Sequence, residues 1–116
     1  MSEEISSKIG HRIMLRRKQL RYTQEKAAEK SGLSHQFFST VETGRKNLRA
    51  ESIIKVARAL EVSTDYLLTG TINQVDIDNI SKSLLQLSGT ELHCLEEIIK
   101  NYLKALGHLE WDDTDQ

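Results

Sequence analysis

The chain has 116 residues, 38% of them hydrophobic, which fits one domain with a small appendage. No stretch approaches the roughly 18 apolar residues of a membrane span, and the acidic, polar N-terminus is unlike a signal peptide. The single cysteine, Cys94, excludes an internal disulfide and fits a reducing compartment. We therefore expect a cytoplasmic protein with no membrane partner.

The formal net charge of −1 hides an uneven distribution. Residues 1–70 hold thirteen Lys and Arg against eight Asp and Glu, a balance of +5. Residues 71–116 hold three against nine, a balance of −6. Such asymmetry favours a basic part that binds phosphates and an acidic part kept away from them.

The first predicted helix covers Ile5–Arg21. Ile9, Ile13 and Leu20 recur at helical spacing, and Arg17 falls on the same side, so this stripe is expected to face inward. The remaining basic residues of the helix lie mostly off the stripe, and we interpret them chiefly as a solvated face. They are Arg12, Arg16, Lys18 and Arg21.

The stretch Thr23–Lys46 contains start and stop signals for two short helices. Thr23 and Ser34 are residue types that cap helix N-termini through side-chain oxygens. Gly32 can close a helix in the left-handed conformation, and Gly44 follows the end of the second helix. The predicted helices are Gln24–Ser31 and His35–Thr43.

The second of these helices has two distinct faces. Phe38 and Val41, at i and i+3, are expected to be buried against Ala27 and Ala28 of the first helix. A separate stripe carries short or planar hydrogen-bonding side chains, not the long Glu and Lys of an ordinary solvated face. Its members are His35, Gln36, Ser39, Thr40 and Thr43. A DNA major groove admits one α-helix, and such side chains can read its base edges.

Two more helices, Glu51–Leu60 and Thr64–Leu68, complete the N-terminal half. The residues of Glu51–Leu60 expected to face inward are Ile53, Ile54, Ala57 and Leu60.

A short polar linker over residues 69–75 precedes two amphipathic helices, Asp76–Leu87 and Thr90–Leu106. Ser88 and Glu91 form a capping-box pattern at the start of the second. The apolar residues expected to pair between protomers are Leu84, Leu92, Leu95, Ile98, Ile99, Tyr102, Leu103 and Leu106. This hairpin is too small to bury its own stripe, so it either folds back onto the N-terminal domain or, as we favour, forms a homodimer. Trp111 in the acidic tail is a candidate to dock on the hairpin.

Together these residues resemble the lambda-repressor-like helix-turn-helix family of the Xre/Cro type. The matching positions are Thr23, Gln24, Ala28, Gly32, Leu33, Ser34, Phe38, Val41, Glu42, Gly44 and Arg45, then Ile54, Ala57–Leu60, Val62 and Asp65–Leu68. The resemblance covers Ile9 to Gly70 and implies a five-helix DNA-binding domain at residues 1–70. With a helical hairpin and an acidic tail at residues 71–116, the expected fold is all-α.

The resemblance also implies roles for four residues. The family pairs the position of Arg17 with that of Glu42, and a carboxylate in the last turn of a helix needs a cation because it faces the negative end of the dipole. We expect a structural ion pair; otherwise Arg17 would contact a phosphate. The family's glutamine, here Gln24, contacts a phosphate and braces the first side chain of the recognition helix, here His35. Otherwise Gln24 is a plain exposed residue.

Candidate DNA contacts divide into base-reading and backbone-binding residues. The base-reading candidates are His35, Gln36, Ser39 and Thr40. The backbone candidates are Gln24, Ser34, Thr43, Arg45, Lys46 and Asn47. Gln36 is the strongest base reader, because a planar amide can bond the edge of adenine in two places. Phe37 either packs beside the turn or lies against sugars and thymine methyl groups.

No catalytic or metal-binding constellation converges. His93 and Cys94 are neighbours about 100° apart around a helix and cannot both face one ion, and neither belongs to a zinc-type spacing. We expect no enzyme, no metal and no cofactor.

The favoured function is a transcriptional repressor that binds a two-fold-symmetric operator in double-stranded DNA as a homodimer. Two alternatives stay open. One is an antitoxin or protein-interaction subunit with the same fold, and the other is a regulator that senses a small molecule or peptide through the hairpin. The sequence does not identify the operator, an effector or a partner protein.

Overall fold

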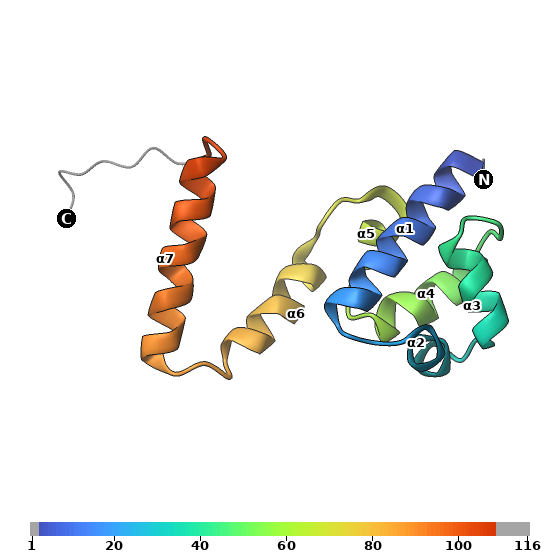
Figure 1. Cartoon of the computed structure of the whole chain (residues 1–116), viewed down its shortest axis with the longest axis horizontal. Coiled ribbons are helices and arrows are strands. Elements are labelled where there is room, and N and C mark those ends of the chain that lie inside the picture. The colour runs from blue at the N-terminus through green and yellow to red at the C-terminus, as the bar shows by residue number, and fades with distance from the viewer. Residues whose placement is uncertain (1–2, 109–116) are drawn as a thin grey trace. The chain divides into compact units, whose positions relative to one another are not determined.

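The computed structural model describes residues 3–108, and every regular element in that range is a helix (Figure 1). The helices are α1 (Glu3–Gln19), α2 (Gln24–Ser31), α3 (His35–Glu42), α4 (Ala50–Ala59), α5 (Thr64–Thr69), α6 (Gln74–Leu84) and α7 (Gly89–Ala105). The predicted all-α fold is confirmed. None of these described helices is long and apolar enough to cross a lipid bilayer.

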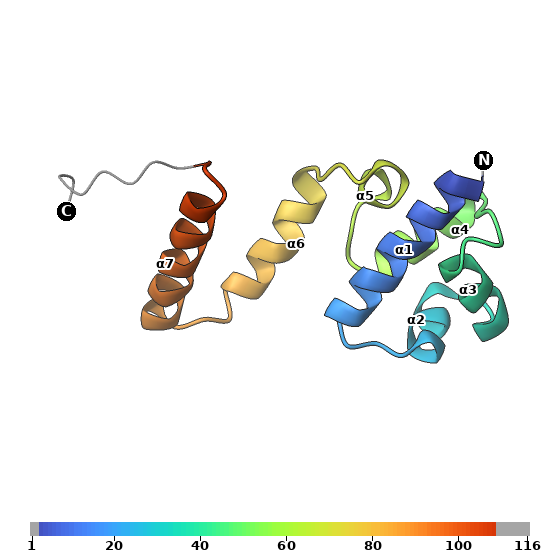
Figure 2. The same ribbon diagram turned by 45° about the horizontal axis from the view of Figure 1, so that its top comes forward.

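The chain divides into two compact units, of which the first reaches Asn79 and the second begins at Ile80. Within the first unit α1 packs on α3 and α5, α2 packs on α3 and α4, and α4 packs on α5 (Figure 2). Trp111, the candidate for docking on the C-terminal helices, lies outside the described residues.

The core of the first unit is built from the apolar stripes of α1 to α5. Its buried members are Ile9, Ile13, Ala27, Ala28, Phe38, Val41, Leu48, Ile53, Val56, Ala57, Leu60 and Leu67. The expected inward position of Ile54 is wrong, because this side chain is 44% exposed. Apolar residues on α4 occur on more than one side, and the stripe that is buried follows i, i+3, i+4 and i+7 from Ile53, which selects Val56 instead.

The first helix ends at Gln19, two residues earlier than expected. Arg21 has a positive φ of 60°, and the next amide, that of Tyr22, returns to the carbonyl of Arg17 at 3.0 Å. This left-handed turn closes the helix in the way a C-terminal glycine usually does. Leu20 therefore lies beyond the helix, although it still packs against the core.

The crossing of α1 and α3 depends on the absence of a side chain at Gly10. A Cβ built there would lie 2.3 Å from the carbonyl oxygen of Val41 and 2.7 Å from that of Glu42. Real carbon atoms do not approach an oxygen this closely, so only glycine lets the two backbones meet at this distance. The crossing brings the end of α3 against α1.

Candidate nucleic-acid interface

Local capping fixes the turn between α2 and α3. The hydroxyl oxygen of Thr23 accepts a hydrogen bond from the amide of Lys26 at 3.0 Å and opens α2. Gly32, with φ of 68°, closes α2 in the left-handed conformation, and Ser34 opens α3 by accepting from the amide of Phe37 at 3.1 Å. The two predicted caps and the glycine stop are all confirmed.

The predicted polar stripe of α3 forms one ridge, which we call the reading ridge: His35, Gln36, Ser39, Thr40 and Thr43. His35, Gln36 and Thr43 are exposed, whereas Ser39 and Thr40 are half-buried. The hydroxyl of Thr40 donates to the carbonyl of Phe37 at 2.7 Å, and that of Thr43 donates to the carbonyl of Thr40 at 2.8 Å. Because each hydroxyl has only one proton and donates it to the backbone, either threonine can make a further hydrogen bond through its hydroxyl only as an acceptor.

A shallow depression of about 260 Å³ lies beside the ridge, lined by Ser34, Gln36, Phe37, Thr40 and Lys46. Phe37 is half-buried and packs against the core while also lining this depression. The ring therefore combines packing beside the turn with an outer surface at the ridge.

The loop after α3 is basic and exposed. The side chains of Arg45 and Lys46 form no ion pair or hydrogen bond with any residue in the range 4–108. Asn47 differs from them, because its side-chain oxygen accepts a hydrogen bond from the hydroxyl of Ser6 on α1. The loop thus presents two cations next to the ridge that no described side chain neutralises.

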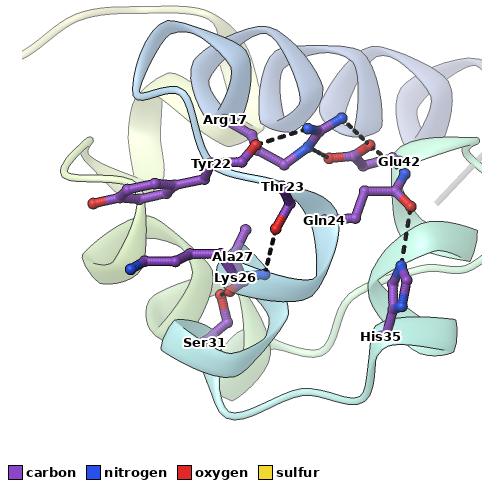
Figure 3. A network of polar contacts seen from close by, with 9 residues as sticks. All are labelled: Arg17, Tyr22, Thr23, Gln24, Lys26, Ala27, Ser31, His35 and Glu42. Carbon is purple, nitrogen blue, oxygen red and sulfur yellow. Dashed lines mark hydrogen bonds and ion pairs between the residues drawn. The ribbon is translucent and has the colours of Figure 1, made fainter.

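Behind the ridge, Arg17 and Glu42 form an internal ion pair (Figure 3). The Nε of Arg17 lies 2.6 Å from one carboxylate oxygen of Glu42, and Nη2 lies 3.1 Å from the other. The side chain of Glu42 is only 4% exposed and that of Arg17 12%. Nη1 of Arg17 also donates to the carbonyl of Tyr22 at 2.9 Å, which ties the pair to the segment before α2.

Gln24 connects this ion pair to the first residue of α3. Its Nε2 donates to Oε1 of Glu42 at 2.9 Å, and its Oε1 lies 3.3 Å from Nε2 of His35 (Figure 3). The bracing of His35 by Gln24 that the family resemblance implies is therefore present in the geometry. A continuous chain of polar contacts runs from α1 to the start of the reading ridge.

Comparison with known proteins places this arrangement in a family. A family model described as Helix-turn-helix matches residues 13–67, from α1 into α5. The uncharacterized HTH-type transcriptional regulator YqaE of Bacillus subtilis (strain 168) is 32% identical over 95 residues, which cover 78% of this chain and 82% of YqaE. The chain belongs to the helix-turn-helix family of transcriptional regulators.

Two further likenesses agree with the family. Repressor protein C2 of Salmonella phage P22 is 32% identical over 69 residues, which cover 60% of this chain and 32% of C2, so the match spans about a third of that protein's length. The crystal structure of the restriction-modification controller protein C.AhdI from Aeromonas hydrophila superposes with a TM-score of 0.52 at 32% identity, covering 53% of this chain and 94% of that one. The helix-turn-helix regulator thus has the Xre/Cro-type DNA-binding domain that its sequence resembles.

Two arginines of this helix-turn-helix regulator have a structural task that the sequence analysis missed. Nη1 of Arg12 donates to the carbonyl of Leu67 at 3.0 Å, and Nε of Arg16 donates to the carbonyl of Leu60 at 2.9 Å. Each guanidinium therefore satisfies a carbonyl at the end of a helix, where four carbonyls lack intrahelical partners. The interpretation of Arg12 and Arg16 as a solvated face is wrong. The two carbonyls lie 55 and 44 positions away in the sequence, so no local pattern identified these bonds.

Asp76 is a further residue that the sequence analysis left without a role. It is buried, and its carboxylate accepts hydrogen bonds from the amide and hydroxyl of Ser63 and from the amide of Asn73. Burial alone would raise the pKa of Asp76, but the bonds from Asn73 and Ser63, helped by the positive charge of Arg16, outweigh it and hold the pKa below its ordinary value. The pattern Asn73-x-x-Asp76 resembles a capping box and was the available signal.

His93, Glu96 and Glu97 bring one ligand atom each within 4.8 Å on α7. All three are exposed, and Glu96 is already paired with Lys100 at 3.6 Å. This grouping has the spacing of ordinary surface charges at i, i+3 and i+4. Cys94, next to His93, is exposed as well.

Proposed function

We propose that this transcriptional regulator acts as a repressor that occupies a two-fold-symmetric operator as a homodimer. The observation that carries the proposal is the reading ridge on α3, exposed at His35, Gln36 and Thr43 and held from behind by an ion pair buried between α1 and α3. The similarity to a phage repressor supports repression as the outcome of binding.

Base recognition is assigned to the N-terminal and central part of the ridge. The amide of Gln36 is exposed, and it offers both a donor and an acceptor, the combination that bonds adenine N7 and N6. His35, Ser39 and Thr40 supply neighbouring contacts. Recognition helices of this type place their N-terminal residues against base edges, which agrees with these positions.

Backbone contacts are assigned around the ridge. Arg45, Lys46 and Asn47 follow α3, Ser34 opens it, and Thr43 closes it. Gln24 opens α2, whose first amides have no intrahelical acceptors and favour an anion. Phosphate contacts fix the position of the protein on the duplex and make its affinity depend on salt.

Dimerisation is assigned to the C-terminal helices. No described residue of α7 is buried, and the exposed fractions of Ile98 and Tyr102 reach 63% and 65%. The other members of the proposed interface are Leu84, Leu92, Leu95, Ile99, Leu103 and Leu106. Exposed apolar surface of this kind is most simply covered by a symmetric partner, and two recognition helices would then read half-sites about 34–36 Å apart.

Selection of bound sequences from a random duplex pool tests the proposal. A motif with two-fold symmetry is expected, together with an affinity that falls steeply as salt rises. Binding that recovers no motif, or that ignores salt, would contradict it.

The dimer has a test of its own in sedimentation equilibrium. Ile98→Asp should give a monomer with much weaker operator binding, whereas Asn101→Asp adds the same charge at an exposed polar position of α7 and should change neither. A wild-type protein that sediments as a monomer at micromolar concentration would reject the homodimer.

A further inference from the structure

We propose that the contacts behind the ridge fix neutral His35 in the tautomer that carries its proton on Nε2. The free nitrogen Nδ1 is then available to DNA as a hydrogen-bond acceptor, so that His35 selects a base with an amino group in the major groove. This inference rests on the proposed function and assigns the class of base read at one position.

The first step is the direction of the Gln24 amide. A carboxylate paired with arginine only accepts hydrogen bonds, and a guanidinium only donates them. Both oxygens of Glu42 already accept from Arg17, and Oε1 takes a further bond at 2.9 Å from Gln24. Only the NH₂ group of an amide can donate that bond. The amide oxygen of Gln24 must therefore point the other way.

The direction of the Gln24 amide determines which nitrogen of His35 carries the proton. The oxygen of Gln24 lies 3.3 Å from Nε2 of His35, and an amide oxygen only accepts (Figure 3). Nε2 must supply the hydrogen. A neutral imidazole has one N–H, so Nδ1 keeps a lone pair. No hydrogen bond joins Nδ1 to any residue in the range 4–108.

An accepting Nδ1 limits which bases can bond to His35. His35 is exposed and is the first residue of α3. In the major groove adenine presents the N6 amino group and cytosine the N4 amino group, whereas guanine presents O6 and N7 and thymine O4, all of them acceptors. Nδ1 can accept a hydrogen bond from adenine or cytosine. Opposite guanine or thymine, its lone pair would meet the lone pair of another acceptor, which is unfavourable. The position under His35 is therefore expected to be adenine or cytosine.

The tautomer can be measured in the free protein without any DNA. Nitrogen-15 NMR of histidine-labelled full-length protein at about pH 8.5, well above an ordinary imidazole pKa of about 6.5, reports which nitrogen carries the proton. His35 should show a protonated Nε2 and an unprotonated Nδ1, whereas the exposed His108 should average over both forms. Gln24→Met should return His35 to an average like that of His108, and the control Gln36→Met should leave it fixed. An averaged signal in the wild type, or a proton on Nδ1, would overturn the inference.

The base preference is measured with duplexes that differ only at the pair under His35. Wild type should favour adenine or cytosine by about three- to tenfold, the effect of one hydrogen bond. Gln24→Met should lose this ratio while keeping the preference at the position read by Gln36. An unchanged ratio would overturn the assignment of the base. Absence of any sequence preference would reject the proposed function as well, whereas a tautomer that is not fixed rejects this inference alone.

Discussion

Asp76 accepts two hydrogen bonds from a single residue, one from the amide of Ser63 at 2.7 Å and one from its hydroxyl at 2.8 Å. Ser63 in turn caps α5 by accepting from the amide of Tyr66 at 3.0 Å. One carboxylate near the start of α6 thereby holds the start of α5. Because Asn79 of α6 also donates to the carbonyl of Glu61 at 2.8 Å, the first two turns of α6 are attached to the first unit.

Asp76→Asn is expected to lower the free energy of unfolding at pH 7 by about 1–3 kcal/mol, because it weakens a buried, fully bonded carboxylate. The pKa of Asp76 is lower in the folded protein than in the unfolded chain, so its contribution is present above the ordinary aspartate pKa and is lost as the pH falls through the lowered value. Urea denaturation of wild type and variant should therefore converge in acid. Asp78→Asn, at an exposed position two residues on, is the matched control. A wild type–variant difference that stays constant from neutral pH to about pH 3 would contradict this assignment.

Removing one partner of the internal ion pair should be costly. Arg17→Met leaves the carboxylate of Glu42 buried without its cation, and we expect a loss of roughly 3–5 kcal/mol in the free energy of unfolding. Adding Glu42→Leu to the same chain removes the orphaned charge and should recover much of that loss. A double-mutant cycle by urea denaturation measures the coupling. Additive effects of the two substitutions would mean that the pair is not coupled.

Gln36→Ala should weaken operator binding by about 1–3 kcal/mol while leaving the melting temperature nearly unchanged, because the side chain is exposed. Fluorescence anisotropy with operator and with random duplex separates the two effects. The exposed Gln86, remote in sequence from the ridge, supplies the control substitution Gln86→Ala. Equal weakening on both duplexes would show that Gln36 does not read a base.

The adjacent phenylalanines should respond differently to truncation. Phe38 is fully buried, and Phe38→Ala is expected to lower the free energy of unfolding by about 3–5 kcal/mol. Phe37 is half-buried, so Phe37→Ala should cost less stability. If Phe37 also lies against sugars and thymine methyl groups, Phe37→Ala should have a larger effect on operator binding than on stability. Equal melting temperatures of the two variants would contradict the burial described here.

Features set by neighbours in the chain were predictable from the sequence. Thr23, Gly32 and Ser34 act within three or four residues of their partners, so local chemistry defines both helices of the turn. The periodic stripe of α3 separated the buried Phe38 and Val41 from the polar ridge for the same reason.

Features set by distant partners were not predictable from spacing. The choice between Ile54 and Val56 on α4 depends on which side of that helix meets the rest of the core, and both residues fit a helical stripe. The bond from Arg16 to the carbonyl of Leu60 joins residues 44 positions apart. Arg17 and Glu42, 25 positions apart, were expected as partners only because of the family resemblance.

The absence of a side chain at Gly10 matters for the polar contacts that lead from Glu42 to His35. Glu42, whose carbonyl oxygen would touch an added methyl group, also carries the carboxylate that orients Gln24 and through it His35. A single extra carbon on α1 would push the end of α3 outward and stretch every later bond in that series. Under the proposed function, a substitution at Gly10 would therefore alter the base preference at His35.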